Sequence, residues 1–170
     1  IGPHDPIPSF LDTSGSTDYE GEIAVVIGRG GRGISEADAH AHIFGYTIVN
    51  DVTARTLQHK HRQWILGKGI DGFCPMGPAI VTADAAGTPP RLSISTWVNG
   101  ELRQRASIGD LIFGIPTLIA TISAAITLEP GDIIATGTPV GVGIGFTPPK
   151  FLKPGDRIRI EVPGIGVLEN

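Results

Sequence analysis

The sequence predicts a mainly β domain with a few short helices, an α+β class, and three observations support that prediction. First, 24 glycines and 14 prolines make up 38 of the 170 residues, about 22% against roughly 12% in ordinary proteins. Both residue types are unfavourable inside helices, which excludes a helical bundle. Second, residues 23–27 form a β-branched, strand-forming run. Third, Asn99-Gly100 separates two strand-like stretches, and this dipeptide favours a two-residue hairpin turn.

The first half of the chain alternates strand patterns with turn signals. Residues 1–18 contain three prolines and a Ser/Thr/Gly run, which predicts an extended arm. Further along, apolar runs predict strands, and Ser35 followed by acidic residues predicts the start of a helix. In order, we expect strand 20–27, a glycine-rich turn over 28–33, helix 36–44, strand 46–49 and one or two helical turns over 52–59.

The second half continues the β pattern around one longer helix. Pro116 suits a first helical position, and apolar residues then recur at helical spacing as far as residue 125. Two Pro-Gly-Asp turns precede the last two expected strands. The expected strands are 79–82, 92–98, 133–136 and 157–162. Neither a linker nor a shift in composition separates these elements, so we expect one domain over residues 1–170.

Charge and composition argue against several functional classes. The net charge is −4, which argues against electrostatic binding of nucleic acid, and the single short Arg-Gly element over 28–33 is better read as a turn. No apolar run approaches the ~20 residues of a membrane span. The only cysteine, Cys74, cannot form an internal disulfide. With no signal peptide visible, we expect a cytoplasmic protein without nucleic-acid or membrane partners.

Three carboxylates form the candidate metal site. Glu20 and Glu22 are two residues apart in an expected strand, so they lie on one face and repel each other unless solvent, a proton or a cation intervenes. Asp51 follows the next expected strand. Such oxygen ligands suit Mg²⁺, Mn²⁺ or Ca²⁺, whereas no Cys or His pair has zinc-ligand spacing. The alternative interpretations are a solvated strand face for the glutamates and a helix N-cap for Asp51.

Polar residues after Asp51 are candidates for substrate binding. Arg55 and Gln58 would share a helical face with Asp51, where the guanidinium could hold a substrate carboxylate in two hydrogen bonds. The alternative is an ordinary surface pair between Arg55 and Asp51. Lys68 stands between two glycines, which allow close approach of a ligand, or it is a solvated loop lysine.

A second glycine-rich loop follows the expected strand 133–136. Thr136 and Thr138 bring hydroxyls, and Gly137, Gly141 and Gly143 bring flexible backbone to this loop. Such loops can bind anions through their N–H groups. No helix pattern follows, so the loop is not a dinucleotide fingerprint. The alternative is a plain connection between strands.

Five motifs in this order resemble signatures of the fumarylacetoacetate hydrolase family, and they span nearly the whole chain. The first is Asp18-Tyr19-Glu20-Gly21-Glu22 with the apolar run after it, and the second runs from Asn50-Asp51 to Gln58. The third is Gly67-Lys68-Gly69-Ile70-Asp71-Gly72 with Phe73-Cys74-Pro75. The last two are Trp97-Val98-Asn99-Gly100-Glu101 and Thr136-Gly137-Thr138-Pro139 with the following Val140-Gly141-Val142-Gly143.

The resemblance implies a mixed β-sandwich roll, a homodimer and a bound Mg²⁺ or Mn²⁺. By similarity, Glu20, Glu22 and Asp51 would be the metal ligands. Substrate-binding residues would be Arg55, Gln58, Lys68 and Thr138, with Lys68 also in a catalytic role. The substrates of the family are small 2-oxo acids, often acylpyruvates. Its members hydrolyse a carbon–carbon bond, decarboxylate, isomerise or tautomerise them.

Hydrolysis of an acylpyruvate-type β-diketo acid through a metal-stabilised enolate is the first expectation for this chain. Oxaloacetate decarboxylation comes second, isomerisation third, and a non-catalytic binding domain is the alternative from another class. Hydrolytic members carry a His and a Glu on a lid before the Tyr-Glu-x-Glu strand. Here His4 is the only histidine before Glu20 and is not assigned this role. The sequence begins with Ile1, so we expect a catalytic core that lacks its N-terminal segment and lid.

Overall fold

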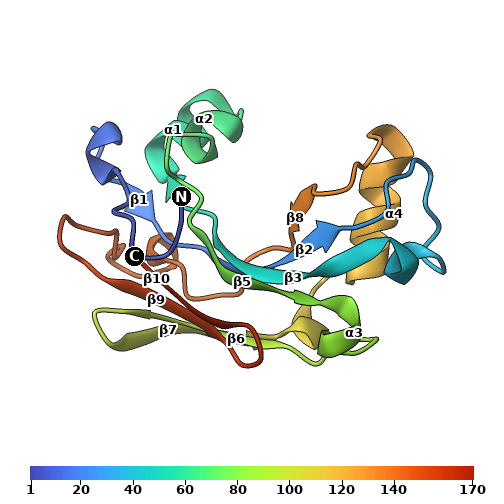
Figure 1. Ribbon diagram of the computed structural model, residues 1–170. Coiled ribbons are helices and arrows are strands. Elements are labelled where there is room, and N and C mark those ends of the chain that lie inside the picture. The colour runs from blue at the N-terminus through green and yellow to red at the C-terminus, as the bar shows by residue number, and fades with distance from the viewer.

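The computed structural model describes all 170 residues except the side chain of His61. Two four-stranded sheets pack face to face, and a short two-stranded sheet lies beside them (Figure 1). The helical pair α1 (Arg55–His61) and α2 (Ile65–Lys68) stands apart from the helix α4 (Ile115–Ala125), on the other side of the molecule (Figure 1). The mainly β class predicted from the glycine and proline content is confirmed.

The first sheet carries the strands that precede the candidate site residues. Its order is β5-β3-β2-β8 and every neighbouring pair is antiparallel. Its strands are β2 (Gly21–Ile27), β3 (Ile43–Asn50), β5 (Met76–Thr82) and β8 (Ile133–Ala135). In the pairing of β2 with β3, Gly21 lies opposite Asn50 and Glu22 lies opposite Val49. The start of β2 and the end of β3 therefore meet.

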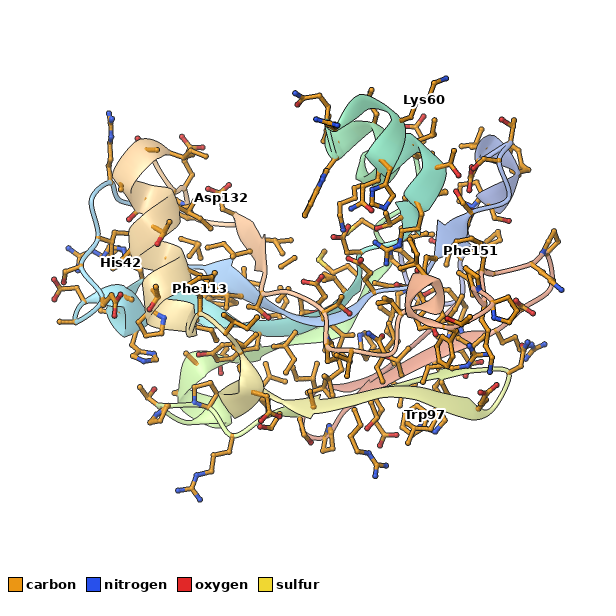
Figure 2. All side chains as sticks on the ribbon, turned by 180° about the vertical axis from the view of Figure 1, so that it is seen from behind. His42, Lys60, Trp97, Phe113, Asp132 and Phe151 are labelled. Carbon is orange, nitrogen blue, oxygen red and sulfur yellow. The ribbon has the colours of Figure 1, made fainter. Side chains whose placement is uncertain are left out.

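The second sheet has the order β10-β9-β6-β7 and is also antiparallel. Its strands are β6 (Ser93–Val98), β7 (Glu101–Ser107), β9 (Ile158–Val162) and β10 (Gly166–Glu169). The hairpin predicted at Asn99-Gly100 joins β6 to β7, and both residues have positive φ, 51° and 81°, as a type I′ turn requires. Trp97 lies on the outer face of this sheet (Figure 2).

The hydrophobic core lies between the two sheets. Alternate residues of β2, namely Ile23, Val25 and Ile27, belong to the main core cluster, as do Ile94 of β6 and Ile160 of β9. At the start of β2 the sheets approach so closely that a Cβ on Gly21 would collide with the Thr96 side chain. Because Gly21 faces the second sheet, its neighbours Glu20 and Glu22 face the opposite side.

The remaining elements are short. The small sheet pairs β1 (Thr17–Asp18) with β4 (Thr53–Ala54). The α-helices are α1 (Arg55–His61), α2 (Ile65–Lys68), α3 (Ala83–Ala86) and α4 (Ile115–Ala125). The 3₁₀ turns are η1 (Ser9–Leu11), η2 (Ala39–His42), η3 (Ile108–Asp110) and η4 (Gly143–Gly145). Within the described residues, no helix has both the length and the apolar character that a membrane span requires.

One helix prediction is wrong, and a second predicted helix begins three residues later than expected. The expected helix 36–44 is reduced to a turn and η2, because Ile43 already pairs with Ile27 and begins β3. The expected helical turns over 52–59 begin only at Arg55, after the short strand β4. In both places strand pairing with a distant segment outweighs the local helix signals. The other expected strands are present, and helix 116–125 is confirmed as α4.

Candidate active site

Glu20, Glu22 and Asp51 meet where β2 begins and β3 ends. Asp51 follows β3 directly, and its backbone N–H donates to the Glu20 carbonyl over 2.9 Å. One carboxylate oxygen from each residue lies within 4.8 Å of the other two, and among the described residues this is the group that could hold a metal ion. The predicted convergence of the three carboxylates is therefore present. The N-cap alternative for Asp51 is wrong, because α1 begins after Ala54.

These carboxylates are shielded from solvent. Glu20 and Glu22 are only 7% and 3% exposed, so the solvated-face alternative is wrong. Burial raises the pKa of the Glu22 carboxyl to about 7; the hydrogen bond from the Gly137 N–H opposes this rise, and the charges of Asp51 and Glu20 add to it. Burial also raises the pKa of Asp51, against the effect of Lys68. Buried carboxylates that repel one another favour a cation among them.

Lys68 brings a positive charge into this cluster from the end of α2. Its Nζ donates to Glu20 Oε2 over 2.8 Å and to Asp51 Oδ2. Burial acts to lower the pKa of the ammonium, but the hydrogen bonds to Asp51 and Glu20 outweigh it and raise the pKa above its usual value. Lys68 therefore stays protonated near neutral pH and is not a solvated loop lysine. Gly67 allows this placement, because a Cβ there would collide with the α1 backbone.

Arg55 also contacts the cluster, through the Glu20 oxygen that Lys68 does not contact. Its Nε donates to Asp18 Oδ2 over 2.9 Å, and its Nη1 lies 2.6 Å from Glu20 Oε1. The same Nη1 donates to Gln58 Oε1 over 3.3 Å. The surface pair with Asp51 that the spacing allowed is absent from the described contacts, because Asp51 precedes the helix. Arg55 is 6% exposed, and its buried Nη2 has no partner among the described atoms.

The loop after β8 closes the cluster on another side. The Gly137 N–H donates to Glu22 Oε2 over 2.7 Å. Thr138 donates its hydroxyl to the Gly21 carbonyl over 3.1 Å and accepts from Gln104 Nε2 over 2.7 Å. The loop is thus a structural part of the site. Thr138 is held against the start of β2, next to the glutamates.

Sequence reasoning missed Asp18 and Gln104. Asp18 is fully buried beneath Arg55, and Gln104 is buried between the Gly21 N–H and Thr138. Asp18 stands inside the first motif, which was the available signal. Gln104 lies in an ordinary alternating strand, and nothing in its local pattern distinguishes it.

The family can now be assigned. The model of the fumarylacetoacetate (FAA) hydrolase C-terminal family matches residues 1–170. The chain belongs to this family. The resemblance drawn from the five motifs is therefore confirmed, and so is the expected fold type.

Among curated relatives of this family member, oxaloacetate tautomerase YisK of Bacillus subtilis (strain 168) is 56% identical over 169 residues, covering 99% of this chain and 56% of YisK. A solved fumarylacetoacetate hydrolase (EaFAH) from Exiguobacterium antarcticum superposes with a TM-score of 0.95 and 49% identity, covering 100% of this chain and 61% of that one. The chain spans about half to three fifths of the length of these relatives.

A third relative carries a different activity in its name. The 2-hydroxyhepta-2,4-diene-1,7-dioate isomerase of Mycobacterium marinum superposes with a TM-score of 0.87 and 42% identity, covering 100% of this chain and 63% of that one. The relatives of this family member are thus named as a tautomerase, a hydrolase and an isomerase. The family is shared, while the reaction named differs between them.

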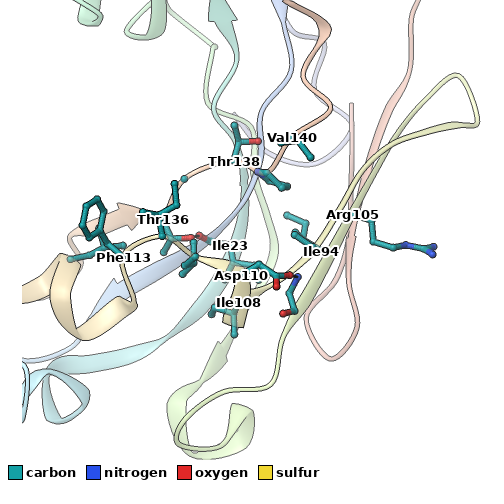
Figure 3. A pocket seen from close by; sticks show the side chains of 16 residues that line it. Ile23, Ile94, Arg105, Ile108, Asp110, Phe113, Thr136, Thr138 and Val140 are labelled. Atoms are coloured by element: carbon teal, nitrogen blue, oxygen red, sulfur yellow. Dashed lines mark hydrogen bonds between the residues drawn. The ribbon is translucent and has the colours of Figure 1, made fainter. Parts of the chain in front are cut away.

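The family member also has an apolar pocket on the far side of the 136–140 loop. It measures about 570 Å³ and is lined by residues of β7, η3 and α4 as well as by Thr136–Val140 (Figure 3). Phe113 and Val140 stand at this pocket with 61% and 88% of their surface exposed. The cluster carboxylates and Lys68 do not line it. The loop thus separates a charged site from an apolar one.

Proposed function

We propose that this chain is the catalytic region of a divalent-metal-dependent enzyme that enolises a small 2-oxo acid, with keto–enol tautomerisation as its first candidate reaction. The observation that carries the proposal is the group of three carboxylate oxygens within 4.8 Å of one another, with a protonated Lys68 hydrogen-bonded to two of the carboxylates. The 56% identity to a protein named oxaloacetate tautomerase supports tautomerisation ahead of the hydrolysis expected from the motifs.

The residues present fit a hard divalent cation. Glu20, Glu22 and Asp51 offer only oxygen donors, which Mg²⁺, Mn²⁺ and Ca²⁺ prefer. Burial raises the pKa of Glu22 to about 7 and the charges of Asp51 and Glu20 add to the rise, so a cation among these carboxylates would offset their repulsion. These three residues would hold the ion. When bound, the ion supplies Lewis acidity toward a 2-oxo-carboxylate and favours the enolate form.

The chain's own groups would orient the substrate and stabilise its charge. Lys68 Nζ, held on Glu20 and Asp51, is a fixed hydrogen-bond donor beside the position where an enolate oxygen would develop. Arg55 holds Glu20 Oε1 in place. Its Nη2 is buried without an acceptor among the described contacts, and a substrate carboxylate would supply one; Gln58 accepts from the neighbouring Nη1. Thr138 keeps the 136–140 loop against β2.

Tautomerisation requires a proton to move between carbon and oxygen, whereas hydrolysis additionally requires a base that activates water. Tautomerisation therefore requires fewer catalytic groups from the described residues than hydrolysis does. Carbon–carbon hydrolysis of an acylpyruvate is the second candidate, favoured by the similarity to EaFAH. Oxaloacetate decarboxylation and dienoate isomerisation also pass through an enolate and are the remaining candidate reactions.

The test is a substrate panel with Mn²⁺ or Mg²⁺ and with a chelator. We expect the loss of enol-oxaloacetate absorbance to exceed that of a metal-only blank, and the Glu20→Ala/Glu22→Ala variant to return to the blank. The control is Glu161→Ala, at a half-buried position on β9 outside the carboxylate cluster. Faster acylpyruvate cleavage than tautomerisation would reverse the order of the candidates. Tight metal binding without turnover of any panel member would leave a non-catalytic binding domain.

We also propose the homodimer that the resemblance implied. Ile112, Phe113 and Val140 are 91%, 61% and 88% exposed around one pocket, and apolar side chains gathered in this way are typical of interaction surfaces. Light scattering on the eluted protein would decide between a monomer and a dimer. Cytoplasmic location stays a prediction.

A further inference from the structure

Asp18 is a buried carboxylate that the proposed chemistry does not use. It is fully buried at the end of β1, and it is not one of the three carboxylates that could share a metal ion. A carboxylate with no access to solvent is retained only where it has strong partners. The question is therefore what Asp18 holds.

Each carboxylate oxygen of Asp18 accepts two hydrogen bonds. Oδ1 accepts the N–H of Tyr19 over 2.9 Å and that of Gly143 over 2.7 Å. Oδ2 accepts the N–H of Ile144 over 2.9 Å and Arg55 Nε over 2.9 Å. Position 143 has no room for a side chain, since a Cβ would come within 2.5 Å of Asp18 Oδ1. Asp18 is thus fixed by backbone groups on one side and fixes a guanidinium on the other.

The guanidinium transmits this constraint to the metal-site carboxylate. The Arg55 guanidinium is planar, so its N–H donors keep a fixed fork geometry. With Nε held by Asp18, Nη1 is directed at Glu20 Oε1, 2.6 Å away. Asp18 also balances the guanidinium charge. If that balance were lost, Glu20 would be the main carboxylate partner of Arg55, and its oxygen would be less available to another cation.

We propose that Asp18 is a positioning residue that acts through Arg55 on Glu20 and so sets the metal affinity of the site. This inference rests on the proposed function, because it assumes that Glu20 is a metal ligand. Carboxylates behind metal ligands typically change metal affinity by about 10- to 100-fold when they are replaced. One hydrogen bond and one ion pair, both made by the Arg55 side chain, connect Asp18 to Glu20.

The first experiment measures Mn²⁺ affinity of the 170-residue chain by the loss of the free-Mn²⁺ paramagnetic resonance signal. Asp18→Asn keeps the size of the side chain and removes its charge, and we expect roughly tenfold weaker binding. Asp12→Asn is the matched control. Asp12 is also buried and caps its own turn through Ser14, Ser16 and Thr17. Through Ser16 it supports the Arg55 backbone N–H, but it does not contact the Arg55 side chain. Its Mn²⁺ affinity should stay within about twofold of wild type.

A double-mutant cycle separates positioning from general damage. If Asp18 acts through Arg55, Asp18→Asn should weaken Mn²⁺ binding in the wild-type chain and have little further effect in an Arg55→Gln chain. Additive losses would overturn the inference, because a merely structural role would cost the same in both backgrounds. Unchanged affinity of Asp18→Asn would overturn it as well.

A conservative variant covers the case in which Asp18→Asn does not fold. Arg55→Lys keeps the charge, but a single ammonium cannot span Asp18 and Glu20 as the fork does. We expect roughly tenfold weaker Mn²⁺ binding from it, and wild-type affinity would contradict the inference. Failure of the wild-type chain itself to bind Mn²⁺ would overturn the proposed metal site, and with it the role of Asp18. Wild-type binding without enzymatic turnover would leave the positioning role intact.

Discussion

Two lysine–glutamate pairs in this molecule have similar geometry and very different surroundings. Lys68 Nζ lies 2.8 Å from Glu20, with side chains that are 20% and 10% exposed. Lys150 Nζ lies 3.0 Å from Glu101, with side chains that are 44% and 54% exposed. Water screens the second pair, whereas the charges of the first pair interact more strongly because burial lowers the effective dielectric constant around them. The comparison teaches that burial, rather than the ion-pair distance, distinguishes Lys68, the proposed functional residue, from Lys150.

The largest effect should come from Lys68→Met. The fixed donor for an enolate oxygen is lost, so we expect a roughly 100- to 1,000-fold fall in kcat. Mn²⁺ binding should persist in the same variant, because the three carboxylates remain and a competing ammonium is gone. Steady-state kinetics and an Mn²⁺ titration check the two parts. Activity close to wild type would remove Lys68 from the mechanism.

The pH dependence of stability tests the buried cluster directly. Burial raises the pKa of Glu22 to about 7 in the folded chain from its usual 4.5, so between these pH values the folded state binds a proton that the unfolded state has lost. Metal-free stability should therefore fall as pH rises from about 4.5 to about 7, by about 3 kcal/mol from this group. Urea unfolding at several pH values with a chelator measures it.

Glu22→Gln is the control for that dependence. The amide cannot ionise, so the fall in stability across this pH range should be smaller by the same amount. The Glu161→Gln variant, at a half-buried position outside the cluster, should retain the wild-type dependence. Identical pH profiles for wild type and Glu22→Gln would show that Glu22 does not titrate in this way.

A smaller effect, on stability, is expected from Thr138, where the 136–140 loop meets β2. Thr138→Val removes the hydroxyl that bonds to the Gly21 carbonyl and accepts from Gln104. We expect a loss of about 1–2 kcal/mol in unfolding free energy, because these polar groups are partly buried. Thr127→Val, at an exposed position, should leave stability near wild type. Equal stabilities of the two variants would contradict the structural role of Thr138.

The smallest effect completes the comparison. Lys150→Met removes the exposed counterpart of Lys68 and should leave Tm, Mn²⁺ affinity and kcat indistinguishable from wild type, since exposed ion pairs contribute little. Lys150 also lies over the Phe146 ring, and its backbone N–H donates to the Gly143 carbonyl over 2.9 Å, a bond that the substitution leaves in place. A loss of Mn²⁺ binding in this variant would show that burial is not the deciding difference.

Much of the fold could be predicted because several of its elements have causes in the local sequence. The β-branched run of β2, the Asn99-Gly100 turn and the Pro116 start of α4 each have a strong local cause. The helix expected over 36–44 failed because Ile43 pairs with Ile27, a contact that no local pattern displays. Helix signals near Ser35 produced only a turn, in which Ser35 accepts the Asp38 N–H.

The candidate site was predictable in its residue types and less so in its connections. Three carboxylates and Lys68 were identified from spacing and motif resemblance, and the structure brings them together. Arg55 was expected to face Asp51 or a substrate. The pair with Asp51 is absent and Arg55 bridges Asp18 and Glu20, because Asp51 follows a strand while Arg55 begins a helix. The contact of Arg55 with a substrate stays a prediction. Strand-to-helix transitions of this kind change which residues share a face.

The sequence by itself determined the class of the fold, its turns and the chemical types at the site: acidic oxygens, one lysine, one arginine and a Gly-Thr-Pro loop. Only the tertiary structure decided which charges are buried and which partners they have. Burial depends on what packs over a residue from elsewhere in the chain, as α2 does when it places Lys68 against Glu20. That long-range packing, and not the residue types, turns a pair of neighbouring glutamates into a site with a raised pKa and a place for a cation.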